Sequence, residues 1–294
     1  MINGIDISGW TTVTDPQALF NAQLLIDFAY IRAHDGYRDD EKYPKYRAMM
    51  RDAKTKNGSV MWGPYMFLGY TGAIGSRTWT AVRGDYQAQN AWNLATAGGQ
   101  EHSLPFAVDA ERISTIISGV RQYVPLPNAY TYCDSYLIPA IEFLSEKQGR
   151  RPVIYCNPDV ILNYLLPQLS KPEFSAIGEC PLWLANWTKT QAEPPYMATI
   201  KAKTPWKTYL IHQYTGDVKD YPGVSDVDLN RGVGTRAMWK AWIKDATALP
   251  VEGGTDPIVI PPPVDPPTTG DADLAEIKSR LARLEAWMKA VKEG

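Results

Sequence analysis

Short apolar runs alternate with longer helical patterns along about the first 245 residues of the chain. The strand-like runs span residues 2–7, 28–33, 62–68, 105–108, 153–156, 182–185 and 209–213, and residues 85–97 and 132–147 have the length and composition of helices. Strands that alternate with helices predict βα units and a largely parallel sheet. We expect this α/β sheet to close, or nearly close, into a barrel, in which the chemistry lies where the strands end.

Proline marks the boundary of this globular body. Seven of the 23 prolines fall between Pro250 and Pro267, in a segment that also contains two adjacent glycines. Such a segment has no hydrophobic period and favours an extended polyproline II spacer. We therefore expect three parts: a body over residues 1–246, a linker over 247–270 and a tail over 271–294.

The tail has a heptad pattern. Its apolar residues recur at alternating intervals of three and four: Leu274, Ile277, Leu281, Leu284, Met288 and Val291. A parallel partner helix would pair Asp273 with Lys278 and Arg280 with Glu285, and both pairs are attractive. The pattern predicts a short coiled coil that joins copies of the chain through residues 274–291. The alternative is a lone amphipathic helix that docks on the body or on a membrane surface.

Composition excludes several classes of protein. Hydrophobic residues make up 45% of the chain and charged residues 21%, which is typical of a globular protein and excludes disorder of the whole chain. The 30 basic residues against 32 acidic ones give a net charge of −2, so nucleic acid is not expected as a partner. No apolar stretch approaches 18 residues, and we expect no membrane span. The first residues also lack the pattern of a secretion signal.

Motifs for metal and nucleotide chemistry are missing from the sequence. The three cysteines, Cys133, Cys156 and Cys180, form neither an even framework nor a C-x-x-C pair. The three histidines are far apart, and there is no serine-hydrolase elbow and no glycine-rich phosphate loop. We expect no cofactor and no metal.

Four acidic residues lie at predicted strand ends: Asp6, Asp109, Glu111 and Asp228. If the strand continues through Glu111, Asp109 and Glu111 project from the same face with Cα atoms about 7 Å apart. Mutual repulsion and partial burial then raise one pKa and leave a proton donor beside an anion. Cleavage of a glycosidic bond requires such a pair, because the leaving oxygen is protonated while positive charge develops on the sugar.

Ordered motifs along the body resemble a known family. They are GIDISGW at residues 4–10, FAYIRA at 28–33, GPYMF at 63–67, FAVDAE at 106–111, PVIY at 152–155, LWLANW at 182–187, QYT at 213–215 and VDLN at 227–230. Over about residues 2–240 the chain is similar to the muramidases of glycoside hydrolase family 25, which are common among bacteriophage endolysins.

This resemblance implies a flattened, incomplete (β/α) barrel that hydrolyses the β-1,4 bond between N-acetylmuramic acid and N-acetylglucosamine in bacterial peptidoglycan. It implies that Glu111 is the general acid and Asp109 its partner, with Asp6 and Asp228 completing an acidic floor. The close pair favours retention of configuration, while the choice between the substrate acetamido group as nucleophile and direct attack by water stays open. The residues expected to line the sugar groove are Tyr65, Tyr155, Trp187 and Gln213.

The resemblance also suggests a biological role. We expect a phage endolysin that is made in the host cytoplasm without a signal peptide and reaches the wall through a holin-type pore. The alternatives are a virion-borne or bacterial wall-remodelling muramidase, a hydrolase of another polysaccharide such as a chitin-like chain, and a non-catalytic glycan-binding module.

Two departures from the family pattern stand out. Where the family often reads Lys-Ala-Thr-Glu, this chain has Arg32-Ala-His-Asp35, which puts a binding role of that acidic position in doubt. The stretch 69–84 is longer than expected and contains Trp79. We expect it to form an extra loop over the groove.

Overall fold

The computed structural model describes residues 1–21, 25–56, 58–189, 194–250 and 258–259. The chain divides into two compact units, residues 1–259 and 260–294. The predicted tail helix lies outside the described residues. In the first unit, β17 (Ala248–Leu249) pairs with β18 (Ile258–Val259), so this unit extends beyond residue 246. The three-part division of the chain stays a prediction.

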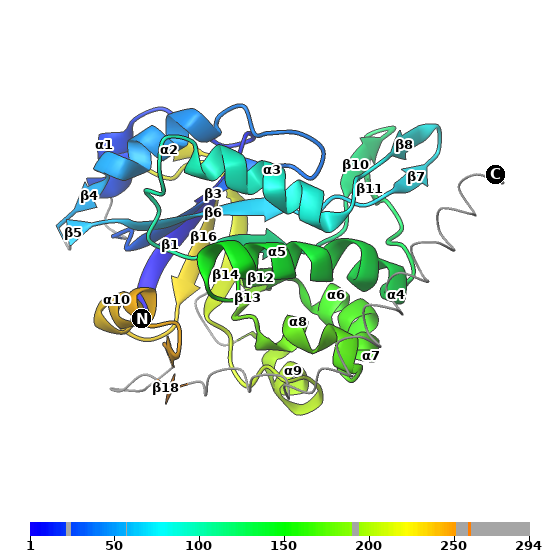
Figure 1. Ribbon diagram of the computed structural model, residues 1–294. Coiled ribbons are helices and arrows are strands. Elements are labelled where there is room, and N and C mark those ends of the chain that lie inside the picture. Colours follow the sequence, from blue (N-terminus) through cyan, green and yellow to red (C-terminus); the bar gives the residue numbers. More distant parts are fainter. Residues whose placement is uncertain (22–24, 57, 190–193, 251–257, 260–294) are drawn as a thin grey trace. The chain divides into compact units, whose positions relative to one another are not determined.

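Eight strands form a closed barrel in the first unit (Figure 1). The first seven are parallel to one another, and the eighth, inserted between the seventh and the first, is antiparallel to both. In chain order the strands are β1 (Ile2–Ile7), β3 (Phe28–His34), β6 (Met61–Phe67), β9 (Ala107–Asp109), β12 (Val153–Cys156), β13 (Leu182–Ala185), β14 (Ile211–Val218) and β16 (Val227–Gly232). The predicted largely parallel α/β barrel is confirmed.

The central strands β12 and β13 are apolar and are covered on both faces. Every residue of β12 and of β13 is buried, as expected where side chains fill the interior and helices cover the outside. Aromatic rings fill the interior around Trp183. Its ring centroid lies 4.9 Å from that of Tyr30, 5.1 Å from that of Tyr155 and 6.3 Å from that of Tyr65.

The predicted helices are present on the outside of the barrel. Residues 85–97 correspond to α3 (Gly84–Thr96), and residues 132–147 fall in a continuous helical segment of α4 (Ala129–Tyr132), the π-helical η1 (Cys133–Leu137) and α5 (Ile138–Gln148). Figure 1 shows α3 and α5 packed side by side. A Cβ atom on Gly84 would lie only 1.7 Å from the Tyr136 carbonyl oxygen, so this close approach requires glycine.

Shorter elements complete the unit. The further helices are α1 (Pro16–Asn21), α2 (Tyr43–Asp52), α6 (Pro158–Val160), η2 (Ile161–Leu165), α7 (Leu166–Leu169), η3 (Pro172–Phe174), α8 (Ser175–Glu179), α9 (Met197–Lys203) and α10 (Arg236–Lys244). The minor strands besides the two hairpins below are β2 (Thr12–Val13), β4 (Lys54–Thr55), β5 (Gly58–Ser59) and β15 (Val224–Ser225). Within the described part of the chain, no helix combines the length and apolar character needed to cross a membrane.

Two β-hairpins follow the carboxyl ends of barrel strands. The first, β7 (Gly72–Ile74) with β8 (Arg77–Trp79), comes after β6, and the second, β10 (Ser114–Ile117) with β11 (Val120–Tyr123), comes after β9. Figure 1 shows the hairpins next to each other at one end of the barrel. Arg77 Nη1 of the first donates a hydrogen bond of 2.7 Å to Thr115 Oγ1 of the second.

Candidate active site

The four acidic residues line one groove of about 1550 Å³ at the mouth of the barrel. Asp6 lies near the end of β1 and Asp109 is the last residue of β9. Asp228 is the second residue of β16, and it reaches the same edge because β16 runs against the other strands. The register of β1 and β16 places Asp228 directly opposite Asp6.

Glu111 reaches the groove by a different route from the one expected. The strand does not continue through Glu111, because β9 ends at Asp109. The Ala110 amide still donates to the Tyr155 carbonyl oxygen at 2.8 Å, but the chain then leaves the sheet towards β10. The expectation that Asp109 and Glu111 share one face of a strand is therefore wrong, although both side chains line the groove.

Gln213 connects the acidic residues to the aromatic ones. Its side chain is 1% exposed, and its Nε2 donates to Asp6 Oδ2 at 3.0 Å and to Asp228 Oδ2 at 3.3 Å. Its Oε1 accepts hydrogen bonds from the Tyr155 hydroxyl at 3.0 Å and from Trp187 Nε1 at 2.8 Å. Two donors and two acceptor lone pairs are all that an amide side chain offers. The protein therefore uses the whole Gln213 amide, which indicates that this residue positions its neighbours.

Asn230 is a second buried amide that contacts the carboxyl group of Asp6. Its Nδ2 donates to Asp6 Oδ2 at 2.7 Å, and its Oδ1 accepts from Trp183 Nε1 at 2.8 Å. Sequence reasoning did not single out Asn230. The available signal was its place two residues after Asp228, because such residues share a face of a strand.

Burial dominates the electrostatics of the cluster. It raises the pKa of Asp6 to about 6, although the hydrogen bonds from Asn230 and Gln213 oppose this change. Burial, reinforced by the charge of Asp6, raises the pKa of Glu111 to about 7 and that of Asp228 to about 8. Several protons are thus held in the groove near neutral pH.

The pKa of Asp109 is raised as well. Burial, followed by the charges of Glu111 and Asp6, raises its pKa well above the usual range. Among the described residues, its buried Oδ1 has no hydrogen-bond partner. This atom is available to a group that enters the groove.

Two arginines face the acidic cluster. Arg32 lines the groove and is held by Asp40, whose Oδ2 lies 2.9 Å from Arg32 Nε. Arg121, on β11, also lines the groove. Both positive charges oppose the rise in the pKa of Glu111. Sequence reasoning noted Arg32 only as a departure and missed Arg121, because nothing local in β11 shows that it faces the groove.

Asp35 lines the groove, but its carboxylate is engaged locally. Its Oδ1 accepts from the backbone amides of Tyr37 and Arg38, at 3.0 and 2.9 Å. Its Oδ2 lies 3.2 Å from Arg38 Nε. These contacts are those of a residue that shapes its own turn.

The predicted sugar-lining aromatic residues all line the groove, but they differ in exposure. Tyr65 and Tyr155 are buried, at 7% and 9% exposed, whereas Trp187 is 51% exposed. Gly216 makes room for the Trp187 ring, since a Cβ there would lie 2.6 Å from it. The sequence did not single out Trp10 as a groove residue, yet it lines the groove and is 80% exposed.

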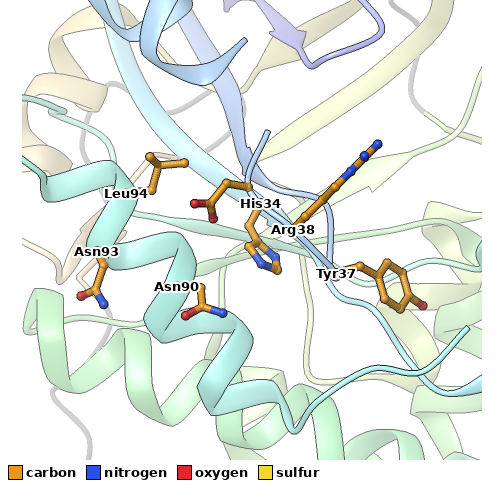
Figure 2. A pocket seen from close by; sticks show the side chains of 7 residues that line it. His34, Tyr37, Arg38, Asn90, Asn93 and Leu94 are labelled. Carbon is orange, nitrogen blue, oxygen red and sulfur yellow. The ribbon is translucent and has the colours of Figure 1, made fainter. Parts of the chain in front are cut away.

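The expected loop over residues 69–84 contains the hairpin β7–β8, and both Arg77 and Trp79 line the groove. A smaller cavity of about 410 Å³ lies beside the groove's Tyr37, between α3 and the chain after β3. Figure 2 shows Asn90 and Asn93 of α3 on one side of it and His34 and Arg38 on the other. It contains none of the four carboxyl groups, so the groove is the candidate active site.

The structure also places the residues considered for metal chemistry. Cys133, Cys156 and Cys180 are free and buried. In the described ranges, no group of three or more histidine, cysteine or acidic side chains has the arrangement of a metal site.

Comparison with known proteins agrees with this geometry. The profile of the family described as glycosyl hydrolases family 25 matches residues 5–224. Among solved structures, a muramidase from Acremonium alcalophilum is similar at 21% identity and a TM-score of 0.54, over 83% of this chain and 99% of that one. A lysozyme from Streptomyces coelicolor is similar at 18% identity and a TM-score of 0.54, over 83% of this chain and 97% of that one.

A modular protein has a similar fold as well. The autolysin LytC from Streptococcus pneumoniae, solved in complex with a synthetic peptidoglycan ligand, is similar at 15% identity and a TM-score of 0.51, over 78% of this chain and 46% of that one. No curated protein matches the sequence at a significant level.

Proposed function

The chain belongs to glycosyl hydrolase family 25, and from this premise we propose that it is an N-acetylmuramidase, which hydrolyses the β-1,4 bond between N-acetylmuramic acid and N-acetylglucosamine in bacterial peptidoglycan. Family membership makes it a glycoside hydrolase. The solved relatives described as muramidase and lysozyme, and the one with a bound peptidoglycan ligand, support peptidoglycan as the substrate.

The observation that carries the proposal is the convergence of four acidic side chains in one groove, with Glu111 held near its protonation midpoint at neutral pH. No hydrogen bond within the described part of the chain engages the Glu111 carboxyl group. It is therefore free to protonate the oxygen that leaves as the glycosidic bond breaks.

The other acidic residues have separate roles in this proposal. Asp109 offers its unpaired Oδ1 to the N–H of the substrate acetamido group. Gln213 holds Asp6 and Asp228 at the floor of the groove, where Asp6, with a pKa of about 6, supplies the negative charge that stabilises the cation developing on the sugar. Trp187 supplies an exposed ring face for a sugar.

Purified peptidoglycan tests the activity. The wild-type protein is expected to lower its turbidity and release new reducing ends of muramic acid, and Glu111→Gln is expected to lower the rate by about 10²- to 10⁴-fold. Glu142→Gln, on the outer helix α5, is the matched control and should keep the full rate. An active Glu111→Gln protein, or reducing N-acetylglucosamine as the product, would overturn the proposal.

We further propose that the protein acts as a bacteriophage endolysin and that residues 274–291 join several copies, so that several grooves engage the wall at once. The succession of a hydrolase body, a proline-rich segment and a heptad pattern supports this role. Protein made inside bacteria is then expected to lyse them only when a holin is expressed with it. Lysis without a holin would contradict the proposed route of release.

A further inference from the structure

One face of the hairpin β10–β11 forms a wall of the groove. The register pairs Ile116 with Arg121 and Ser114 with Tyr123. Because side chains alternate along a strand, these four residues share a face. All four line the groove; of the residues on the other face, Thr115 also lines it, whereas Ile117, Val120 and Gln122 do not. We call the four residues Ser114, Ile116, Arg121 and Tyr123 the hairpin face.

The hairpin face combines exposed apolar surface with a positive charge. Ile116 is 62% exposed and Tyr123 is 51% exposed, and Arg121 between them is exposed as well. Large exposed apolar side chains that lie together in a groove are typical of a ligand-binding surface.

Arg121 differs from the other cations of the groove. In the described residues, the side chains of Arg32, Arg77, Arg112 and Lys219 each contact a polar side chain, respectively of Asp40, Thr115, Asp159 and Asp226. No such partner exists for Arg121 within the same residues. Its charge is therefore available to an anion that enters the groove.

We propose that the hairpin face binds the peptide attached to the muramoyl residue, with Arg121 pairing with a carboxylate of that peptide. This inference rests on the proposed muramidase function. The glycan backbone is neutral apart from its substituents, whereas the peptide carries free carboxylates and apolar side chains, which match Arg121 and its neighbours Ile116 and Tyr123.

The position of the hairpin face agrees with this ligand. Arg121 is close enough to Glu111 for its charge to act on that carboxyl group. The peptide is attached to the sugar whose bond is cleaved, so it leaves the glycan chain near the general acid. The other hairpin, β7–β8, supports this wall through the hydrogen bond from Arg77 to Thr115.

The test compares two substrates. The first is peptidoglycan stripped of phosphate polymers, and the second is the same glycan after an amidase has removed the peptides and the lactyl carboxylates that this hydrolysis leaves have been converted to amides. The rate is measured from the new reducing ends. The quantity compared is kcat/KM on the peptide-bearing substrate divided by kcat/KM on the peptide-free glycan. Any effect of Arg121 on Glu111 cancels in this ratio, because the same carboxyl group acts on both substrates.

For Arg121→Gln we expect kcat/KM on the peptide-bearing substrate, divided by that on the peptide-free glycan, to fall about fivefold relative to wild type. Arg121→Lys should recover most of this loss. Arg51→Gln, which removes an exposed charge of α2 outside the groove, should leave the ratio unchanged. An unchanged ratio in Arg121→Gln, or an equal fall in Arg51→Gln, would overturn the inference.

Two further results are distinct from these. If Arg121→Gln lowers kcat/KM only on walls that retain their phosphate polymers, then those polymers, and not the peptide, are the ligand of Arg121. A wild-type protein that cleaves neither substrate would overturn the proposed function itself.

Discussion

The side-chain nitrogen of Gln213 donates a hydrogen bond of 3.0 Å to Oδ2 of Asp6, although 207 residues separate the two in the sequence. The same nitrogen also donates to Asp228, and the Gln213 side-chain oxygen accepts hydrogen bonds from Tyr155 and Trp187. One buried amide thus sets the positions of two acidic side chains and two aromatic ones.

Replacing Gln213 with methionine should lower kcat by about 10- to 100-fold, because small displacements of groups that act on the reacting atoms are costly. The control is Gln168→Met. Gln168 is also buried but lies on α7, where it accepts a hydrogen bond from Lys171. Both variants should lose stability, whereas only Gln213→Met should lose kcat. Equal kcat values for the two variants would contradict the positioning role.

The pH dependence of kcat/KM should show an alkaline limb near pH 7. Glu111 donates a proton only while it is protonated, and its pKa is raised to about 7. Arg121→Gln should shift this limb to higher pH, because the Arg121 charge favours the ionised form of Glu111. Arg51→Gln is the control for the loss of one charge. A limb that stays in place in Arg121→Gln would show that another group controls it.

Glu111→Gln should stabilise the fold in alkaline solution. The pKa of Glu111 is raised from 4.5 to about 7, so its contribution to stability is complete below about pH 4.5 and is lost as the pH rises through 7. Glutamine avoids that loss. We expect the variant to gain about 1 to 2 kcal/mol relative to wild type between pH 5 and pH 8. Urea unfolding at both pH values measures this, and the absence of a gain would mean that Glu111 is not desolvated.

A chain that ends at Val259 should sediment as a monomer, whereas the full chain should form oligomers. The shortened chain keeps the pairing of β17 with β18 and lacks the heptads of residues 274–291. Sedimentation equilibrium gives the mass of each particle. One protomer per particle in both samples would refute the predicted coiled coil.

Much of the barrel could be predicted because its strands are buried on both faces. Apolar runs predicted the bounds of β12 and β13 to the residue, and the strand-like run of residues 2–7, which also contains Asn3 and Asp6, predicted those of β1. β16 was not predicted as a strand, because its sequence VDLNRG alternates polar and apolar residues and contains no apolar run. β16 is buried only because it closes the barrel between β1 and β14, and no local sequence pattern predicts that closure.

The sequence by itself placed two of the four acidic side chains, Asp6 and Asp109, where strands end, since the composition and length of a strand-like run are local properties. Only the tertiary structure decided how they meet. The antiparallel direction of β16 places Asp228 opposite Asp6, and the end of β9 at Asp109 sends Glu111 into the groove from a loop. The amides of Gln213 and Asn230 acquire their roles from partners that are distant along the chain. Such contacts exist only after the barrel has closed.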